Sequence, residues 1–81
     1  MKPVYSKQAQ KFLDRQTEEN RERIISAIEN LPAGDVRKLA GREGYRLRVG
    51  SYRVIFDREE HVIYIMRIDN RGDVYKGGSK R

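Results

Sequence analysis

The chain has 81 residues, a formal net charge of +6, 37% charged residues, and neither Cys nor Trp. This length suits one modest core, so we expect residues 1–81 to form a single domain, with residues 76–81 as a flexible basic tail. Without Cys there are no disulfides, iron–sulfur clusters or thiolate zinc sites, and the single His excludes an all-His metal centre. We therefore expect neither a metal nor a cofactor.

The sequence contains no apolar run that approaches the ~18 residues needed to cross a bilayer. The first residues carry a basic side chain but no apolar segment of the kind that directs secretion. Together with the lack of Cys, this predicts a cytoplasmic protein with no membrane partner.

The positive charge is confined to one part of the chain. Up to Asp35 the basic and acidic residues balance, whereas the part after Asp35 has twelve basic and six acidic residues and carries the whole net charge of +6. Most of the excess is Arg, whose planar guanidinium fits a phosphate group with two hydrogen bonds. The imbalance favours a polyanionic partner, and the plainer alternative is a charged surface that keeps the domain in solution.

The first half of the chain predicts a short strand followed by two helices. Residues 2–5 are extended and suit a first or edge strand. Ser6 is a suitable N-cap for a helix that runs to about residue 16, and Thr17 is a suitable N-cap for a second helix that ends near Pro32. Apolar side chains at helical spacing give each helix one buried face, and they are Ala9, Phe12, Leu13, Ile24, Ile25, Ile28 and Leu31.

After residue 36 the apolar period changes from about 3.6 to 2, which indicates strands. Residues 45–49 and 52–56 are expected to form a hairpin joined by Gly50 and Ser51 in a type II′ turn. The remaining expected segments are a turn at 57–60, a nearly continuous apolar strand at 61–68 buried on both faces, a turn at 69–72 and a short strand at 73–75. His61 is expected at the surface.

These elements predict an α+β fold, with an N-terminal strand and an α-helical hairpin packed on one face of a twisted, mainly antiparallel β-sheet. Strict alternation then places Arg46, Arg48 and Arg53 together on the other, partly open face. Three neighbouring guanidinium groups repel one another unless an anion joins them, which favours an anion-binding site. The alternative is that they point outward only because a surface must be polar.

The run Gly-Tyr-Arg-Leu-Arg-Val-Gly-Ser-Tyr-Arg-Val-Ile-Phe at residues 44–56 resembles the central hairpin of the RelE/ParE superfamily of bacterial and archaeal toxins. Lys-Leu-Ala-Gly at 38–41 and Arg-Gly-Asp-Val-Tyr-Lys at 71–76 also match, and the helical hairpin agrees in length and position. The resemblance covers essentially the whole chain. It implies the RelE-like microbial RNase fold and favours the RelE-like branch.

For that branch the resemblance implies the toxin of a type II toxin–antitoxin system, a ribosome-dependent mRNA endoribonuclease or mRNA interferase. Such a toxin cleaves mRNA in the ribosomal A site without a metal, through attack of the ribose 2′-hydroxyl on the adjacent phosphodiester. The implied partners are mRNA on the ribosome and a cognate acidic antitoxin protein.

The resemblance also implies roles for single residues. Arg53 and Arg71 would hold the scissile phosphate, Arg48 would bind a flanking phosphate and assist the reaction, and Tyr75 would stack on a base or transfer a proton. The further expected RNA-binding residues are Arg46, Lys7, Lys11 and Lys76. Many relatives carry a His where this chain has Asn70. Some also carry a Lys where this chain has Arg. An Arg side chain keeps its proton at neutral pH, so it cannot readily act as the general base.

Two other functions fit the same residues. The ParE-like branch shares the fold but inhibits DNA gyrase and cleaves no RNA. A toxin scaffold that has lost its activity would only bind its antitoxin.

Overall fold

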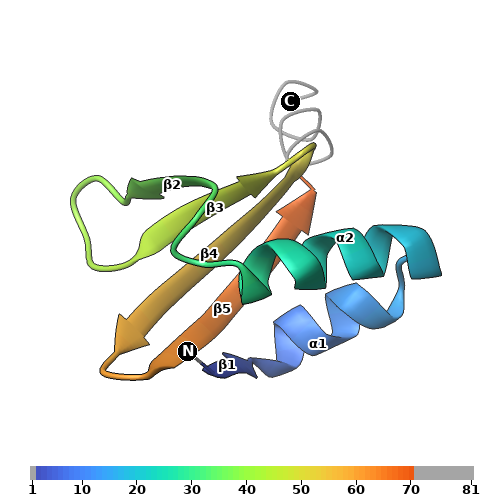
Figure 1. Ribbon diagram of the computed structural model, residues 1–81, viewed down its shortest axis with the longest axis horizontal. Coiled ribbons are helices and arrows are strands. Elements are labelled where there is room, and N and C mark those ends of the chain that lie inside the picture. The colour runs from blue at the N-terminus through green and yellow to red at the C-terminus, as the bar shows by residue number, and fades with distance from the viewer. Residues whose placement is uncertain (1, 71–81) are drawn as a thin grey trace, which may run out of the picture.

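The structure, a computed structural model, describes residues 2–70. The predicted site residues Arg71, Tyr75 and Lys76, the expected strand at 73–75 and the expected tail at 76–81 lie outside this part. The elements are β1 (Lys2–Tyr5), α1 (Lys7–Asp14), α2 (Glu18–Glu29), β2 (Asp35–Lys38), β3 (Tyr45–Val49), β4 (Tyr52–Glu59) and β5 (Val62–Asn70) (Figure 1). Within the described residues, no helix is both long and apolar enough to pass through a membrane.

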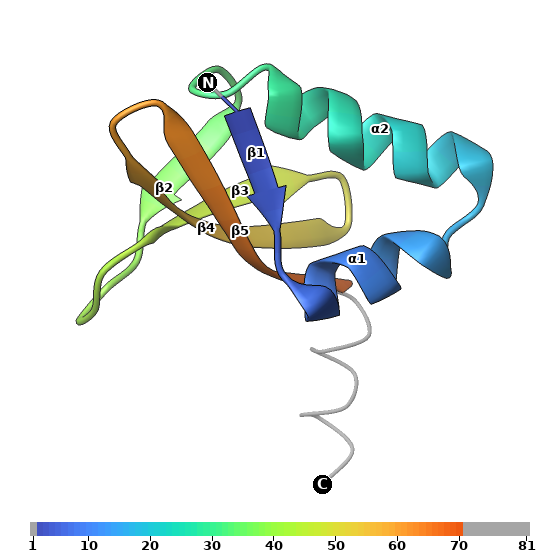
Figure 2. The same ribbon diagram turned by 90° about the horizontal axis from the view of Figure 1, so that it is seen from below.

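Side-chain caps begin both helices, as the sequence predicts. The Ser6 hydroxyl oxygen accepts a hydrogen bond from the Ala9 backbone N–H at 3.1 Å. The Thr17 hydroxyl oxygen accepts one from the Asn20 N–H at 3.2 Å, and Glu18 occupies the first turn of α2, where the helix dipole favours a negative charge. The two helices form a hairpin on one side of the sheet (Figure 2).

The five strands form one sheet in the order β1-β5-β4-β3-β2. Strand β1 is parallel to β5, and β2 to β5 form an antiparallel meander. The β3–β4 hairpin closes on the pair Val49 and Tyr52, and Gly50 has φ = +59° while Ser51 has no positive φ, the pattern of a type II′ turn. The predicted hairpin is therefore confirmed.

The strands differ from the sequence prediction in three places. Strand β2 was not expected, because its sequence Asp-Val-Arg-Lys contains a single apolar residue and shows no period. Strand β4 continues to Glu59, so the turn that follows it consists of Glu60 and His61 and not of the predicted residues 57–60. Strand β5 continues to Asn70, so Asp69 and Asn70 lie in a strand and not in the predicted turn.

The hydrophobic core lies between the helices and one face of the sheet. Its most enclosed side chains include Ile24 and Ile28 from α2 and Val54, Ile65 and Ile68 from the sheet. Neither α1 nor α2 covers the opposite face of the sheet (Figure 2). The prediction that the last long strand is buried on both faces is wrong, since Tyr64 and Met66 on β5 are 40% and 45% exposed.

Candidate functional site on the open face of the sheet

The register of the β3–β4 hairpin brings the predicted arginines together. Arg48 pairs directly with Arg53, and Arg46 pairs with Ile55. Directly opposed side chains share a face, and the neighbouring Leu47 and Val54 are buried against the helices. Arg46, Arg48 and Arg53 therefore lie together on the face away from the helices, as the alternation predicts.

Two acidic residues complete a row that crosses four strands. Asp35 of β2 pairs with Arg48, Arg48 with Arg53, and Arg53 with Asp69 of β5. We call this set, Asp35, Arg48, Arg53 and Asp69, the acid–arginine row. Arg48 Nε lies 3.7 Å from Asp35 Oδ2, and Arg53 Nη2 lies 3.5 Å from Asp69 Oδ2. Each arginine is thus held from its outer side by a carboxylate.

A second row runs parallel to the first, and it is more basic. Arg37, Arg46, Ile55 and Arg67 occupy successive positions across β2, β3, β4 and β5. Ile55 is only 6% exposed although it lies outside the core cluster on the helix side. Its neighbours in the row are Arg46 and Arg67, and the aliphatic stems of arginines can cover apolar surface while their charged ends stay accessible.

Asp69 is the buried acidic residue of the described chain, with 8% of its surface exposed. Arg67 Nε donates to both of its carboxylate oxygens at 3.0 Å, so Asp69 contacts Arg67 as well as Arg53. The Nε atoms of Arg46 and Arg53 are buried and have no hydrogen-bond partner among the described residues. The open face gathers several guanidinium groups, and the terminal N–H groups of such side chains are suited to binding an anion.

A β-bulge determines which residues of β5 reach this face. Ile55 pairs with Arg67 and Phe56 with Ile65, so Met66 is an additional residue on β5. Strict alternation from Ile63 and Ile65 would send residues 67 and 69 into the core. The bulge instead buries Ile68 and turns Arg67 and Asp69 to the open face. Sequence analysis missed both residues because a bulge leaves no clear signal in an apolar run. It also missed Arg37 and Asp35, which lie on the unexpected β2.

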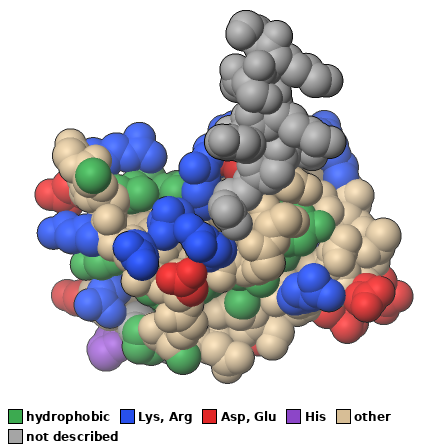
Figure 3. Space-filling view, turned by 90° about the horizontal axis from the view of Figure 1, so that it is seen from above, with side chains coloured by type: hydrophobic (Ala, Val, Ile, Leu, Met, Phe, Trp, Pro, Cys, Tyr) green, Lys and Arg blue, Asp and Glu red, His purple; other side chains and the backbone are tan. Residues whose placement is uncertain are grey.

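The other predicted site residues do not join this cluster in the described part of the chain. Lys7 and Lys11 are exposed on α1, in the helix layer on the other side of the sheet. His61 is exposed in the β4–β5 turn, as expected. Figure 3 looks down on the molecule from above Figure 1 and shows Lys and Arg side chains close together, with acidic side chains beside them.

Residues 4–75 match the family model described as "ParE toxin of type II toxin-antitoxin system, parDE". The chain belongs to this family. It is a toxin of a type II toxin–antitoxin system, and the predicted membership of the RelE/ParE superfamily is confirmed. No curated protein matches the chain significantly.

Two solved structures of similar fold support the same assignment for this toxin. The RelB–RelE antitoxin–toxin complex from Methanococcus jannaschii shares 28% identity and a TM-score of 0.72, over 91% of this chain and 96% of that one. The archaeal RelE–RelB complex from Pyrococcus horikoshii shares 30% identity and a TM-score of 0.69, over 88% and 94%. The predicted α+β, RelE-like fold is therefore confirmed.

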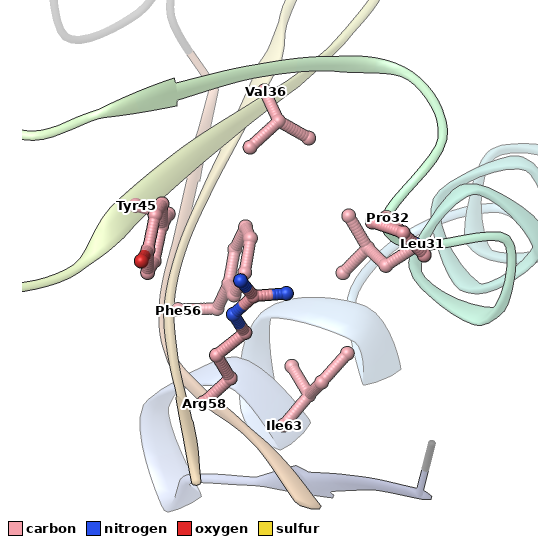
Figure 4. Close-up of a pocket in the computed structure, with 7 residues that line it drawn as sticks. All are labelled: Leu31, Pro32, Val36, Tyr45, Phe56, Arg58 and Ile63. Atoms are coloured by element: carbon pink, nitrogen blue, oxygen red, sulfur yellow. The ribbon is translucent and has the colours of Figure 1, made fainter. Parts of the chain in front are cut away.

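The toxin also has an apolar pocket on the helix side of the sheet, beyond the end of α2 (Figure 4). The Arg58 guanidinium lies 5.6 Å from the centre of the Tyr45 ring, and Tyr45 stacks on Phe56 with 5.4 Å between ring centres. The cavity measures about 150 Å³, and its lining consists of Leu31, Pro32, Val36, Tyr45, Phe56, Arg58 and Ile63. Arg58 is the one charged residue of this lining, and its guanidinium forms no ion pair within residues 2–70.

Proposed function

We propose that this toxin is a ribosome-dependent mRNA endoribonuclease that cleaves mRNA in the ribosomal A site. The observation that carries the proposal is the direct opposition of Arg48 and Arg53 on the open face, with Arg46 beside them. Closely spaced guanidinium groups bind the phosphates of an RNA backbone and stabilise negative charge that develops during cleavage. The two similar structures are both of RelE proteins, which supports the RNA-cleaving branch.

The ion pairs in the acid–arginine row are compatible with RNA binding. The pair of Arg48 with Asp35 is long, at 3.7 Å, and both side chains are at least 40% exposed. Exposed pairs of this kind contribute only about 0–1 kcal/mol, so a phosphate competes with the carboxylate at small cost. Arg53 contacts its carboxylate through Nη2. A guanidinium has five N–H donors, so this contact leaves donors for a phosphate.

The chemistry proposed for this site needs charge stabilisation more than a protein nucleophile. The ribose 2′-oxygen loses its proton to solvent and forms a bond to phosphorus while the bond from phosphorus to the 5′-oxygen breaks, which leaves a cyclic phosphate and a 5′-hydroxyl. Arg53 and Arg71 stabilise the additional negative charge on the phosphate in this step. The Tyr75 phenol donates a proton to the departing oxygen.

The test is an in vitro translation reaction with the purified toxin, followed by primer extension on the mRNA. We expect cuts in phase with codons, and we expect Arg53→Ala to reduce them by roughly 10²-fold or more, because removing one group that stabilises a developing charge costs about that much. Arg15→Ala, at an exposed arginine that follows α1, is the matched control and should cut like the wild type. Absence of cuts on ribosome-bound mRNA would rule out the proposed activity.

A second candidate function is inhibition of DNA gyrase, because the matching family model is that of the ParE toxins. A supercoiling assay with purified gyrase separates the two functions. Inhibition that persists in Arg53→Ala, without any RNA cleavage, would favour gyrase. A protein that causes no growth arrest on expression, yet still forms a stable complex with its antitoxin, would instead be an inactive scaffold.

We further propose that the partner is an acidic, largely helical antitoxin, and that the toxin acts in the cytoplasm, where mRNA is translated. Both similar structures are complexes of a toxin with its antitoxin. An apolar side chain of the partner would fill the pocket beyond α2, and a neighbouring carboxylate would pair with Arg58. This arrangement also suits the net charge of +6.

The partner is tested with the product of the neighbouring reading frame. We expect it to bind the toxin tightly, and we expect Arg58→Glu to weaken binding by roughly tenfold or more, because the reversed charge repels an acidic partner. Arg15→Glu changes the net charge equally but lies away from the pocket, and it should bind almost as the wild type does. Equal affinities for both variants would contradict the assignment of the pocket.

A further inference from the structure

We propose that Asp69 is a positioning residue for RNA cleavage, which holds the Arg53 guanidinium in the orientation that the reaction requires. The inference rests on the proposed function. It starts from one observation, that a carboxylate only 8% exposed lies within the arginine cluster, 3.5 Å from Arg53 Nη2. A buried negative charge in an anion-binding face opposes the binding of RNA, so its presence calls for another role.

The contacts of Asp69 fix its own position first. Arg67 Nε donates to both carboxylate oxygens at 3.0 Å, which prevents the carboxylate from rotating. Asp69 also stands directly opposite Arg53 in the β4–β5 register. The carboxylate is therefore held by Arg67, at the position in the register that faces Arg53.

Asp69 orients Arg53 and leaves it able to bind a phosphate. The contact uses Nη2 alone, at a distance that is long for an ion pair. Arg53 Nε is buried and has no hydrogen-bond partner among the described residues, so the base of the guanidinium is covered while the side chain as a whole stays 34% exposed. A guanidinium held from one side presents its remaining N–H groups in a fixed direction, which lowers the reorganisation needed in the transition state.

Asp35 provides a comparison within the same row. It holds Arg48 in the way that Asp69 holds Arg53, but its side chain is 48% exposed and the contact is 3.7 Å. A long pair in solvent orders its partner weakly. Of these two carboxylates, Asp69 is the one that is buried and that also accepts hydrogen bonds from a second arginine, Arg67.

The charge and the positioning effects of Asp69 have opposite signs, and Asp69→Asn separates them. The variant adds one positive charge to the face, so its affinity for a single-stranded RNA oligonucleotide should rise by a few-fold at low salt. Its single-turnover cleavage rate on ribosome-bound mRNA should fall roughly ten- to hundred-fold, because a small displacement of a catalytic group costs about that much. Asp35→Asn should lower the rate by less than about threefold.

Asp14→Asn is the matched control, because it removes the same charge from the exposed end of α1 in the helix layer. Its cleavage rate should equal that of the wild type. If Asp69 only supported the fold, Asp69→Asn would lower the RNA affinity, the cleavage rate and the unfolding temperature together. If Asp69 acted only through its charge, the variant would raise both the RNA affinity and the cleavage rate. Either result would overturn the proposal.

If Asp69→Asn does not fold, Asp69→Glu decides the question, since it keeps the charge and moves the carboxylate by one methylene. RNA affinity should then stay within about twofold while the rate falls roughly tenfold. Equal cleavage rates for Asp69→Glu and the wild type would overturn the positioning role of Asp69 and leave the proposed function standing. A wild-type toxin that does not cut ribosome-bound mRNA would overturn the proposed function, and this inference would fall with it.

Discussion

Arg48 and Arg53 stand directly opposite each other on β3 and β4, on the face of the sheet away from α1 and α2. Like charges in this relationship destabilise a sheet. The outer neighbours Asp35 and Asp69 offset the repulsion only in part, since their distances to the two arginines are 3.7 and 3.5 Å. The fold thus maintains an unfavourable pair at the place where the proposed function requires positive charge.

Replacing one member of this pair should therefore leave the fold as stable as before or more stable. We expect Arg48→Thr to raise the free energy of unfolding by up to about 1 kcal/mol, because it removes the cross-strand repulsion and Thr suits a strand. Urea unfolding measures this change, and the same variant should cleave less mRNA. A loss of more than about 1 kcal/mol would mean that the ion pair with Asp35 outweighs the repulsion.

The salt dependence of RNA binding distinguishes the two sides of the molecule. Each phosphate contact contributes about 0.7 to the slope of log K against log salt for a single strand. Arg46→Gln should reduce the slope by about that amount, because Arg46 lies on the arginine face. Lys7→Gln and Lys11→Gln should leave it almost unchanged, because these lysines lie in the helix layer.

Fluorescence anisotropy with a labelled oligonucleotide, at a series of salt concentrations, gives these slopes. An unchanged slope for Arg46→Gln would remove it from the RNA-binding set. Equal reductions for the two lysine variants would restore the expectation from sequence that they bind RNA, and would imply that the strand follows the edge of the sheet to α1.

The sequence predicts this fold well where local chemistry decides the structure. Ser6 and Thr17 begin the helices because each caps the backbone three residues later, and Gly50 supplies the positive φ that the hairpin turn requires. The positions of Arg46, Arg48 and Arg53 follow from alternation alone. The sequence alone therefore predicts that these three arginines share one face of the hairpin.

Prediction failed where one strand depends on another. Val36 gives β2 its only apolar residue, and the strand exists through its pairing with β3. Tyr64 and Met66 are large and apolar, yet both are exposed, which no local pattern can indicate. Asp69 reaches the candidate site only because the bulge at Met66 reverses the alternation of β5, and a bulge is a property of the pairing with β4.

The bulge itself leads to a prediction. Deletion of Met66 would remove the bulge and make Ile65 and Arg67 consecutive partners of Phe56 and Ile55, so Arg67 and Asp69 would stay on the open face and Ile68 in the core. We therefore expect the variant to fold. Met66→Thr keeps the additional residue and replaces a side chain that is 45% exposed, so its free energy of unfolding should change by about 0.5 kcal/mol or less. Circular dichroism and thermal unfolding compare the two. A deletion variant that does not fold would show that the bulge does more than set the faces of Arg67, Ile68 and Asp69.

Tyr5, on β1, makes the fold less stable at alkaline pH. Burial of the phenol, and then the negative charge of Glu29, raise the pKa of Tyr5 above its ordinary value of 10.0. Because the folded pKa is higher than the unfolded one, the stabilisation is complete below pH 10 and is lost as the pH rises through the folded pKa. Tyr5→Phe cannot ionise, so its free energy of unfolding should fall less than that of the wild type above pH 10. Urea unfolding at several alkaline pH values measures the difference, and parallel curves for the two proteins would show that Tyr5 ionises equally easily in both states.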